Sequence, residues 1–337
     1  MLTYKVDLDY ESYLFDTNYQ EDSLASKKII SEFEYVFFLV NQESCQLKNY
    51  VDYSDEYLNS LRALGFNLPV LNPHSTEYKY WWSHRHNLKI ERICNSKITS
   101  AHIALEENLG FYKGAVVEKI EDVRSHIEKF PEVHKWIVKS ADSFSGIGHF
   151  QFNVENFDGD KIQAALKNKM LLEPLYERVF DIGATYVIDN GKINDFFMVE
   201  NYNSSAGRFR GGAGSSSVDK FKKYIFEKYK FDLTEYEKQT AIIAKKYLDL
   251  GALFNIQIDS FVYFENEKLK LYPLVEVNYR KTMGLVINSI AKKYPEARIV
   301  EWLLYTNKEL KNINVDSSYV RVSPERNHFQ TFIHPIY

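Results

Sequence analysis

Hydrophobic residues recur along the chain in two periods, so strand-like and helix-like segments alternate. Residues 33–40 read FEYVFFLV, a short apolar run that is typical of a buried strand. The following SDEYLNSLRALGF has the helical spacing of apolar positions, with Ser54 as its N-cap and Gly65 as its end. NLPVLNP then predicts a second short strand. This alternation predicts an α/β unit over residues 1–95.

The middle of the chain predicts a smaller mixed unit over residues 96–170. SKITSAHIALEENLG predicts a helix that begins near Ser96 and ends at Gly110. KWIVKS and HFQFN predict strands on either side of a loop that contains glycine and serine. EDVRSHIEKF and DGDKIQAALKNK predict two further helices.

Longer alternating strands distinguish the third unit, residues 171–337. Asp-Asn-Gly at 189–191 predicts a hairpin turn, and Glu-Asn-Glu at 265–267 predicts a second one. Between the hairpins, NSSAGRFRGGAGSSS at 203–217 predicts a loop, and two helices follow it. The whole pattern therefore predicts an α/β protein with additional α+β elements.

Composition excludes some classes of function. Hydrophobic residues make up 45% and charged residues 26% of the 337 residues, as expected for a globular protein with well-buried cores. The net charge is −4, whereas a general nucleic-acid binder is usually basic. We therefore expect no nucleic-acid partner, and any anion site must be built locally.

Cysteine usage and hydropathy predict the compartment. The two cysteines, Cys45 and Cys94, cannot form a disulfide framework or a cysteine-based zinc site, and they fit a reducing compartment. The N-terminal residues lack the basic and apolar regions of a signal peptide. The apolar run at 35–40 is far too short to span a membrane. These features predict a cytoplasmic protein with no membrane partner.

A strand near the C-terminus carries the first candidate chemistry. In LYPLVEVNYR the two valines alternate with Glu276, Asn278 and Arg280, so the polar side chains share one face. Asp259 lies in the expected partner strand. Mg²⁺ prefers carboxylate and carbonyl oxygens, and an adjacent arginine suits a polyanion. Each residue alone fits a solvated strand face, but the set favours a metal site.

Two loops carry candidate anion-binding groups. Lys139 ends a strand and leads into a loop whose small residues could fold around phosphate oxygens: Ser143, Ser145, Gly146 and Gly148. This loop matches neither a Walker nor a Rossmann motif, and an ordinary loop is the alternative. In AGRFRGG, Arg208 and Arg210 suit bidentate recognition of carboxylate or phosphate on a closing lid. An exposed basic loop explains AGRFRGG equally well.

LLEPLYERVFDIG combines a strand end, a proline and three charged residues. Glu173, Arg178 and Asp181 lie where a hinge could present backbone groups to a purine edge. Carboxylates there could accept hydrogen bonds from an amino group or from ribose hydroxyls. A surface ion pair after a strand is the alternative interpretation.

The order of these motifs resembles the ATP-grasp superfamily. The chain reads NSK, VKSADSFSGIG, LLEP, DIGATYVI, QIDSFVY and VEVNYRKTMG in that order, over about residues 90–290. The superfamily includes D-alanine–D-alanine ligase, glutathione synthetase and peptide-forming carboxylate–amine ligases. The resemblance implies an N-terminal pre-grasp subdomain (1–95) and two subdomains that sandwich a nucleotide, 96–170 and 171–337.

The resemblance also implies two cofactors, ATP and Mg²⁺, and a role for each motif residue. The implied phosphate contacts are Lys97, Lys139 and the flap residues Ser143, Ser145, Gly146 and Gly148. The implied adenine and ribose contacts are Glu173, Leu175 and Asp181. The implied magnesium ligands are Asp259, Glu276 and Asn278, beside Arg280 as a phosphate or acyl-phosphate contact.

The activity implied is ligation of a carboxylate to an amine, forming an amide or peptide bond through an acyl phosphate. Arg280, Arg208 and Arg210 are the expected catalytic cations, and Arg178, Arg208 and Arg210 the expected contacts to a substrate carboxylate. The expected substrates are an amino acid or short peptide, and a homodimer is expected from the general frequency of such assemblies. A small-molecule kinase, a non-catalytic nucleotide-binding regulator and a structural oligomer are the alternatives.

Overall fold

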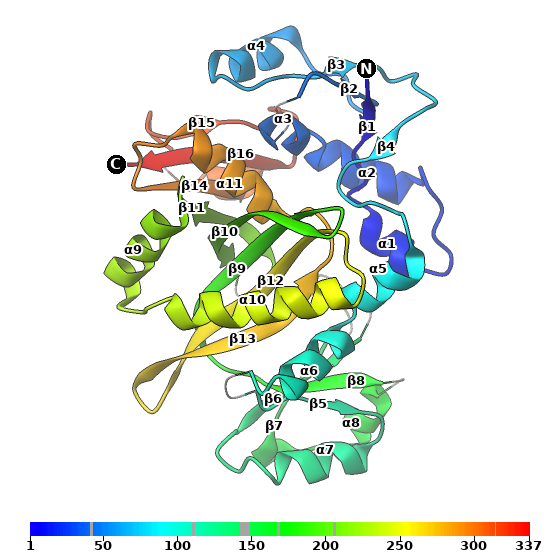
Figure 1. The fold of residues 1–337 in the computed structure, drawn as a ribbon, viewed down its shortest axis with the longest axis vertical. Coiled ribbons are helices and arrows are strands. Elements are labelled where there is room, and N and C mark those ends of the chain that lie inside the picture. Colours follow the sequence, from blue (N-terminus) through cyan, green and yellow to red (C-terminus); the bar gives the residue numbers. More distant parts are fainter. Residues whose placement is uncertain (41–42, 110–111, 142–148, 167–168, 205–206, 314) are drawn as a thin grey trace.

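The computed structural model describes all residues except 41–42, 110–111, 142–148, 167–168, 205–206 and 314, and the described residues form three β-sheets (Figure 1). The first sheet is parallel, with strand order β3-β2-β1-β4. Its strands are β1 (Thr3–Lys5), β2 (Gln46–Leu47), β3 (Val70–Leu71) and β4 (Lys79–Tyr80). The accompanying helices are α1 (Tyr10–Phe15), α2 (Leu24–Phe33), α3 (Val36–Val40), α4 (Asp55–Ala63) and α5 (Leu88–Asn95).

The predicted strand at 33–40 is wrong, because this segment ends α2 and forms α3. Phe37 and Leu39 are at most 1% exposed. The Phe37 ring meets the Trp81 ring edge-on at 5.0 Å, and the Leu39 carbonyl accepts a hydrogen bond from Ser289 Oγ at 3.0 Å. A short run that is apolar at every position has no period, so it cannot distinguish a buried helix from a buried strand.

A four-stranded antiparallel sheet, the small sheet, follows with the order β5-β8-β6-β7. Its strands are β5 (Ala115–Val117), β6 (Lys135–Ser140), β7 (Phe150–Asn153) and β8 (Met170–Pro174). Its helices are α6 (Lys97–Glu106), α7 (Ile120–Ile127), η1 (Val154–Asn156) and α8 (Gly159–Ala165). The predicted limit between residues 170 and 171 falls inside β8, and the subdomain limits stay predictions.

An eight-stranded antiparallel sheet, the large sheet, has the order β13-β12-β9-β10-β11-β14-β16-β15. Its strands are β9 (Arg178–Asp189), β10 (Lys192–Asn203), β11 (Phe209–Gly214), β12 (Phe254–Glu265), β13 (Lys268–Asn278), β14 (Ile299–Thr306), β15 (Val320–Arg321) and β16 (Phe329–Ile336). Its helices are α9 (Val218–Tyr229), α10 (Thr234–Asp249), α11 (Met283–Lys293) and α12 (Asn307–Leu310). Both predicted hairpins are present, at β9–β10 and β12–β13.

The predicted loop at 203–217 is wrong in its second half, because β11 pairs with β10 on one side and β14 on the other. Its glycines allow close packing. A Cβ on Gly212 would lie 2.3 Å from the carbonyl oxygen of Glu200 and 2.7 Å from Cδ1 of Ile287 on α11. The glycine-rich sequence therefore lets α11 lie directly on the sheet.

Separate hydrophobic cores stabilise these layers. One core joins the N-terminal unit to the large sheet and includes Phe37, Trp81, Ile287 and Trp302. A second core lies under α9 and α10, on the opposite face of the large sheet. A third core, within residues 117–172, belongs to the small sheet alone.

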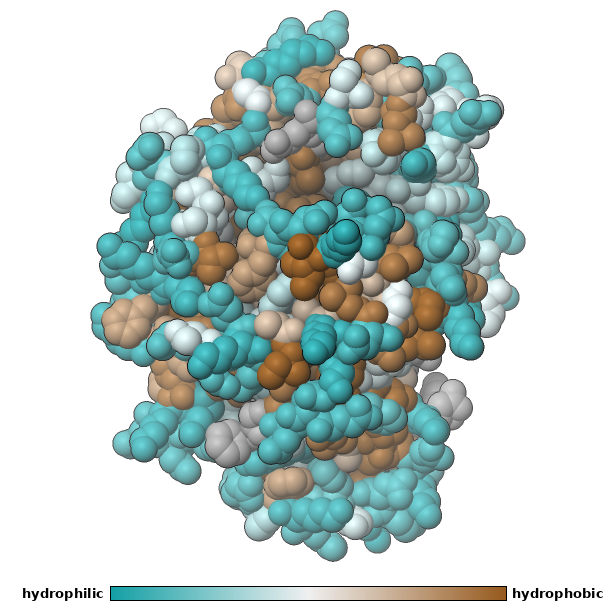
Figure 2. Space-filling view, in the orientation of Figure 1, coloured by the Kyte–Doolittle hydropathy of each residue, from teal (hydrophilic) through white to brown (hydrophobic). Residues whose placement is uncertain are grey.

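Among the described residues, no helix is long and apolar enough to cross a membrane. On the face shown in Figure 2, hydrophobic side chains appear in several groups between hydrophilic ones. Scattered exposed apolar residues of this kind are ordinary on protein surfaces. The predicted compartment is not tested by these observations.

Candidate functional site

The predicted metal ligands lie together on one face of the large sheet. Asp259 on β12 is paired with Glu276 on β13, and Gln257 with Asn278. Directly opposed residues of an antiparallel pair point to the same face. Asn278 Nδ2 donates to Asp259 Oδ2 at 2.7 Å, and Gln257 Nε2 donates to Oδ1 at 2.7 Å. The sequence pattern of alternating valines and polar residues thus produces an oxygen-rich cluster.

The electrostatics of the cluster favour a bound cation. Burial, and then the charge of Glu276, raise the pKa of Asp259 to about 7. Burial also tends to raise the pKa of Glu276, but the charges of Lys97 and Lys139 more than offset it, so that pKa is lowered. Lys97 Nζ lies 3.2 Å from Glu276 Oε2. A divalent ion between the two carboxylates would relieve the repulsion that raises the pKa of Asp259.

The donor set also limits the kind of metal. The described residues hold no group of three or more His, Cys, Asp and Glu side chains suited to a metal ion. Asp259, Glu276 and Asn278 offer two carboxylates and one amide oxygen instead. Mg²⁺ usually takes only one or two protein carboxylates and completes its shell with water and phosphate. The cluster therefore fits Mg²⁺ better than zinc.

The small sheet contributes the second half of the site. Lys139 on β6 and Glu173 on β8 form an ion pair of 2.5 Å, with side chains 8% and 2% exposed. The hydroxyl of Tyr272, on β13 of the large sheet, donates to the other oxygen of Glu173 at 2.7 Å. The charge of Lys139 also acts on Glu276. Four predicted residues, Lys97, Lys139, Glu173 and Glu276, are therefore brought into one charged cluster between the two sheets.

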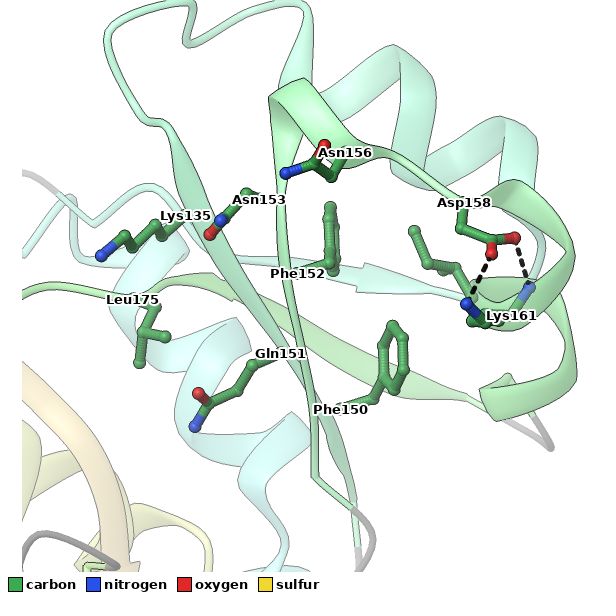
Figure 3. A pocket seen from close by; sticks show the side chains of 10 residues that line it. Lys135, Phe150, Gln151, Phe152, Asn153, Asn156, Asp158, Lys161 and Leu175 are labelled. Carbon is green, nitrogen blue, oxygen red and sulfur yellow. Dashed lines mark hydrogen bonds and ion pairs between the residues drawn. The ribbon is translucent and has the colours of Figure 1, made fainter.

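The segment after β8 connects this cluster to a pocket on the small sheet. The Leu175 amide donates to the Lys135 carbonyl oxygen at 2.8 Å, so its N–H is already used. Leu175 also lines a pocket of about 490 Å³ with Gln151, Phe152 and Lys161 (Figure 3). Among the described residues of the predicted site, Leu175 alone is in that lining. The pocket is therefore distinct from the lysine–carboxylate cluster.

Arg178 and Asp181 lie at the start of β9. They form an ion pair of 2.5 Å, and the Arg178 guanidinium lies 4.4 Å from the Phe261 ring centre. The charge of Asp181 contributes to the raised pKa of Asp259. Asp181 is thus close enough to influence the acidic cluster electrostatically, while its ribose role stays a prediction.

Arg280 connects the acidic cluster to the N-terminal unit. Its Nη2 lies 2.5 Å from Glu11 Oε1 on α1, and its Nη1 donates to the Lys281 carbonyl oxygen at 3.1 Å. Its Nε is buried and has no hydrogen-bond partner among the described residues. The Arg280 charge lowers the pKa values of both Asp259 and Glu276 from what burial would give. One N–H of this guanidinium is therefore unpaired within the part of the chain that the structure describes.

Arg208 and Arg210, the other predicted arginines, lie away from the acidic cluster on β12 and β13. Arg210 pairs with Glu309 at 3.0 Å, and Arg208 is exposed. β11 is four strands from β13, which at about 4.8 Å per strand is roughly 19 Å. Their catalytic and substrate roles stay predictions. The predicted flap residues, Ser143, Ser145, Gly146 and Gly148, lie outside the described residues.

Sequence reasoning missed several residues of the site. Tyr272, Gln257 and Glu11 contact predicted residues directly. Burial, and then the charges of Lys139 and Lys97, lower the pKa of His149. Gln257 could have been found, because it precedes Asp259 by two residues on the same strand and so shares its face. Glu11 could not, because its contact joins segments 269 residues apart.

The chain is similar to known proteins in its three-dimensional structure. No protein-family model and no curated protein sequence matches the chain. N5-carboxyaminoimidazole synthetase from Staphylococcus aureus, complexed with ADP, is similar with a TM-score of 0.54 and 11% identity, covering 99% of this chain and 93% of that one. The carboxyaminoimidazole ribonucleotide synthase of Aspergillus clavatus, complexed with ATP, is similar with a TM-score of 0.51 and 10% identity, covering 99% of this chain and 93% of that one. The biotin carboxylase domain of Hydrogenobacter thermophilus 2-oxoglutarate carboxylase, with MgADP and bicarbonate, is similar with a TM-score of 0.51 and 12% identity, covering 99% of this chain and 80% of that one.

The architecture defines an α/β class in which a small antiparallel sheet faces a large one across charged residues. Similarity over 99% of the chain to the three structures assigns the fold more narrowly. The chain has the ATP-grasp fold, as its motifs predicted. At 10–12% identity the similarity establishes the fold, and the function must be argued from the site.

Proposed function

We propose that the protein is an ATP-dependent carboxylate–amine ligase. The observation that carries this proposal is the cluster between the sheets: Asp259 opposed to Glu276, with Lys97 at 3.2 Å and Lys139 nearby. This arrangement of oxygen ligands and cations suits a nucleotide polyphosphate with a divalent ion. Similar folds hold ATP, ADP or MgADP with bicarbonate, which supports chemistry on a carboxyl group.

Each half of the site has its own task. Asp259, Glu276 and Asn278 would hold Mg²⁺, which supplies charge neutralisation at the phosphate oxygens. Lys97 and Lys139 would contact the phosphates, and each would exchange part of its present carboxylate pairing for them. Glu173 would meet the adenine amino group. Asp181 would meet the ribose.

The proposed reaction has two steps. A carboxylate oxygen of the first substrate bonds to the γ-phosphorus while the bond from that phosphorus to the ADP oxygen breaks. The amine nitrogen of the second substrate then bonds to the acyl carbon, loses a proton, and phosphate leaves with the former carboxylate oxygen. Lys97, Lys139 and Arg280 stabilise the negative charge that moves between these oxygens.

The substrates would bind beside Arg280, where the N-terminal unit meets β13. Trp82 lies there, with its ring centre 5.9 Å from the Arg280 guanidinium, and its carbonyl accepts the Lys281 amide at 2.8 Å. An amino acid or short peptide fits the carboxylate requirement. Arg178, Arg208 and Arg210 are further candidates for the substrate carboxylate. The proposal includes a homodimer, because homodimers are the commonest assemblies of soluble proteins.

The test is ADP release that depends on both an acid and an amine. We would screen pairs of amino acids with the wild type, with Glu276→Gln, and with Asp195→Asn as a control in an exposed ion pair on the large sheet. ADP should form with wild type and control when both substrates are present, with an amide product by mass. Steady ADP release without any acceptor would overturn the ligase mechanism, and a phosphorylated product without amine would indicate a kinase.

A further inference from the structure

His149 has a buried ring nitrogen that nothing described so far uses. Its Nε2 is buried and has no hydrogen-bond partner among the described residues. The residue directly precedes β7, in a ladder that pairs Lys135 with Asn153 and continues to Val138 with Phe150. One further step of this register sets His149 opposite Lys139. Opposed residues point to the same face of an antiparallel sheet.

That face is the one that meets the large sheet. Glu173 is paired with Ile137, which is two residues from Lys139 on β6 and therefore on the same face as Lys139. The alternate residues, Trp136 and Val138, belong to the hydrophobic core of the small sheet. The His149 ring therefore lies on the charged side of the sheet.

The surroundings keep the imidazole neutral. Burial, then the charges of Lys139 and Lys97, lower the pKa of His149 to about 4, while Glu276 and Glu173 act in the opposite direction. A neutral imidazole still has one N–H donor, and it adds a directed hydrogen bond without adding a third cation to the site. An unused donor beside two lysines suits an anionic ligand.

We propose that His149 is a phosphate-binding residue, which donates a hydrogen bond from Nε2 to a phosphate oxygen of the nucleotide. This inference rests on the proposed nucleotide site and adds a residue from the start of β7 to it. It also assigns the tautomer, because Nε2 must carry the proton while Nδ1 does not.

The experiment measures binding of MgATP, MgADP and adenosine by calorimetric titration. His149→Phe keeps a ring of similar size without a donor, and His149→Gln places an amide N–H near the position of Nε2. His149→Asn is a second loss variant, because its shorter amide reaches the position of Nδ1 instead. His102→Phe is the control, since His102 is an exposed histidine on α6.

Loss of a hydrogen bond to a charged acceptor should weaken MgATP binding about tenfold or more in His149→Phe and His149→Asn. His149→Gln and His102→Phe should stay within about threefold of wild type, and adenosine should bind all five proteins alike. Unchanged MgATP binding in both loss variants would overturn this inference alone. Equal weakening of adenosine would also overturn it, because the residue would then act on the base or the fold. A wild type that binds neither nucleotide would overturn the proposed function and this inference with it.

Discussion

Replacing Asp259 with asparagine should stabilise the ligand-free protein at alkaline pH. Burial and the charge of Glu276 raise the pKa of Asp259 from its ordinary 3.8 to about 7 in the folded chain. An acid whose pKa is raised by folding contributes stability below its unfolded pKa and loses that contribution as pH rises through the folded pKa. A difference of about three units corresponds to a loss on the order of 4 kcal/mol between pH 4 and pH 8.

The asparagine substitution has a compensating cost. Asp259 accepts hydrogen bonds from both Gln257 and Asn278, and asparagine has one oxygen fewer for them. Losing a hydrogen bond to a charged acceptor costs about 2 kcal/mol. The relieved cost of burying the Asp259 charge, together with its repulsion from Glu276, is larger at pH 8, so Asp259→Asn should be about 2 kcal/mol more stable than wild type there. At pH 5 Asp259 is mostly protonated in the folded chain, so most of this cost is already absent and the variant should gain nothing.

Urea unfolding with a chelator at pH 5 and pH 8, followed by tryptophan fluorescence, measures both differences. Asp7 and Glu34 also have pKa values raised by burial, to about 6 and about 7, but they are present in both proteins and cancel. Asp195→Asn removes an exposed ion pair and should change stability by less than about 1 kcal/mol at both pH values. A stability difference for Asp259→Asn that is equal at pH 5 and pH 8 would refute the reasoning.

Three further predictions follow from the same contacts. Saturating MgATP at 100 times Kd should stabilise wild type by about 2.7 kcal/mol, which raises the Tm of a chain of this length by roughly 4 °C. Differential scanning fluorimetry measures this rise, and Glu276→Gln should show none. Lys139→Met should cost about 3–5 kcal/mol in urea unfolding, because it leaves Glu173 buried without its partner, and adding Glu173→Gln should recover most of that loss. Gly212→Ala should cost about 1–3 kcal/mol in the same assay, because its Cβ would meet the Glu200 carbonyl; full stability would contradict the packing of α11 on β11.

The sequence predicted the parts of the fold that local patterns determine. The helix at α4 begins after Ser54, whose side chain accepts from the Tyr57 amide, and the chain turns at Gly65 with a φ of +78°. The β9–β10 turn likewise uses Asn190 and Gly191 at positive φ. Cap and turn residues act over a few positions, so their effect can be identified without the rest of the chain.

Long-range packing decided what the sequence could not predict. Residues 33–40 are helical because α3 is enclosed on all sides, and the glycines after Arg210 are in a strand because α11 covers them. The same distinction holds for the site. Asp259 and Glu276 could be paired from strand period alone, whereas the Glu11–Arg280 contact depends on how two distant units dock.

The separate core of the small sheet has a thermodynamic consequence. The N-terminal unit and the large sheet share one hydrophobic core, whereas the core around Trp136 contains residues of the small sheet and its helices alone. Cooperative units in proteins tend to follow such shared cores. Calorimetry should therefore resolve two transitions, and amide exchange should report a separate foldon at residues 115–174. A body that is its own foldon can change its angle to the rest of the molecule without exposing either core, which is what a clamp over a ligand requires.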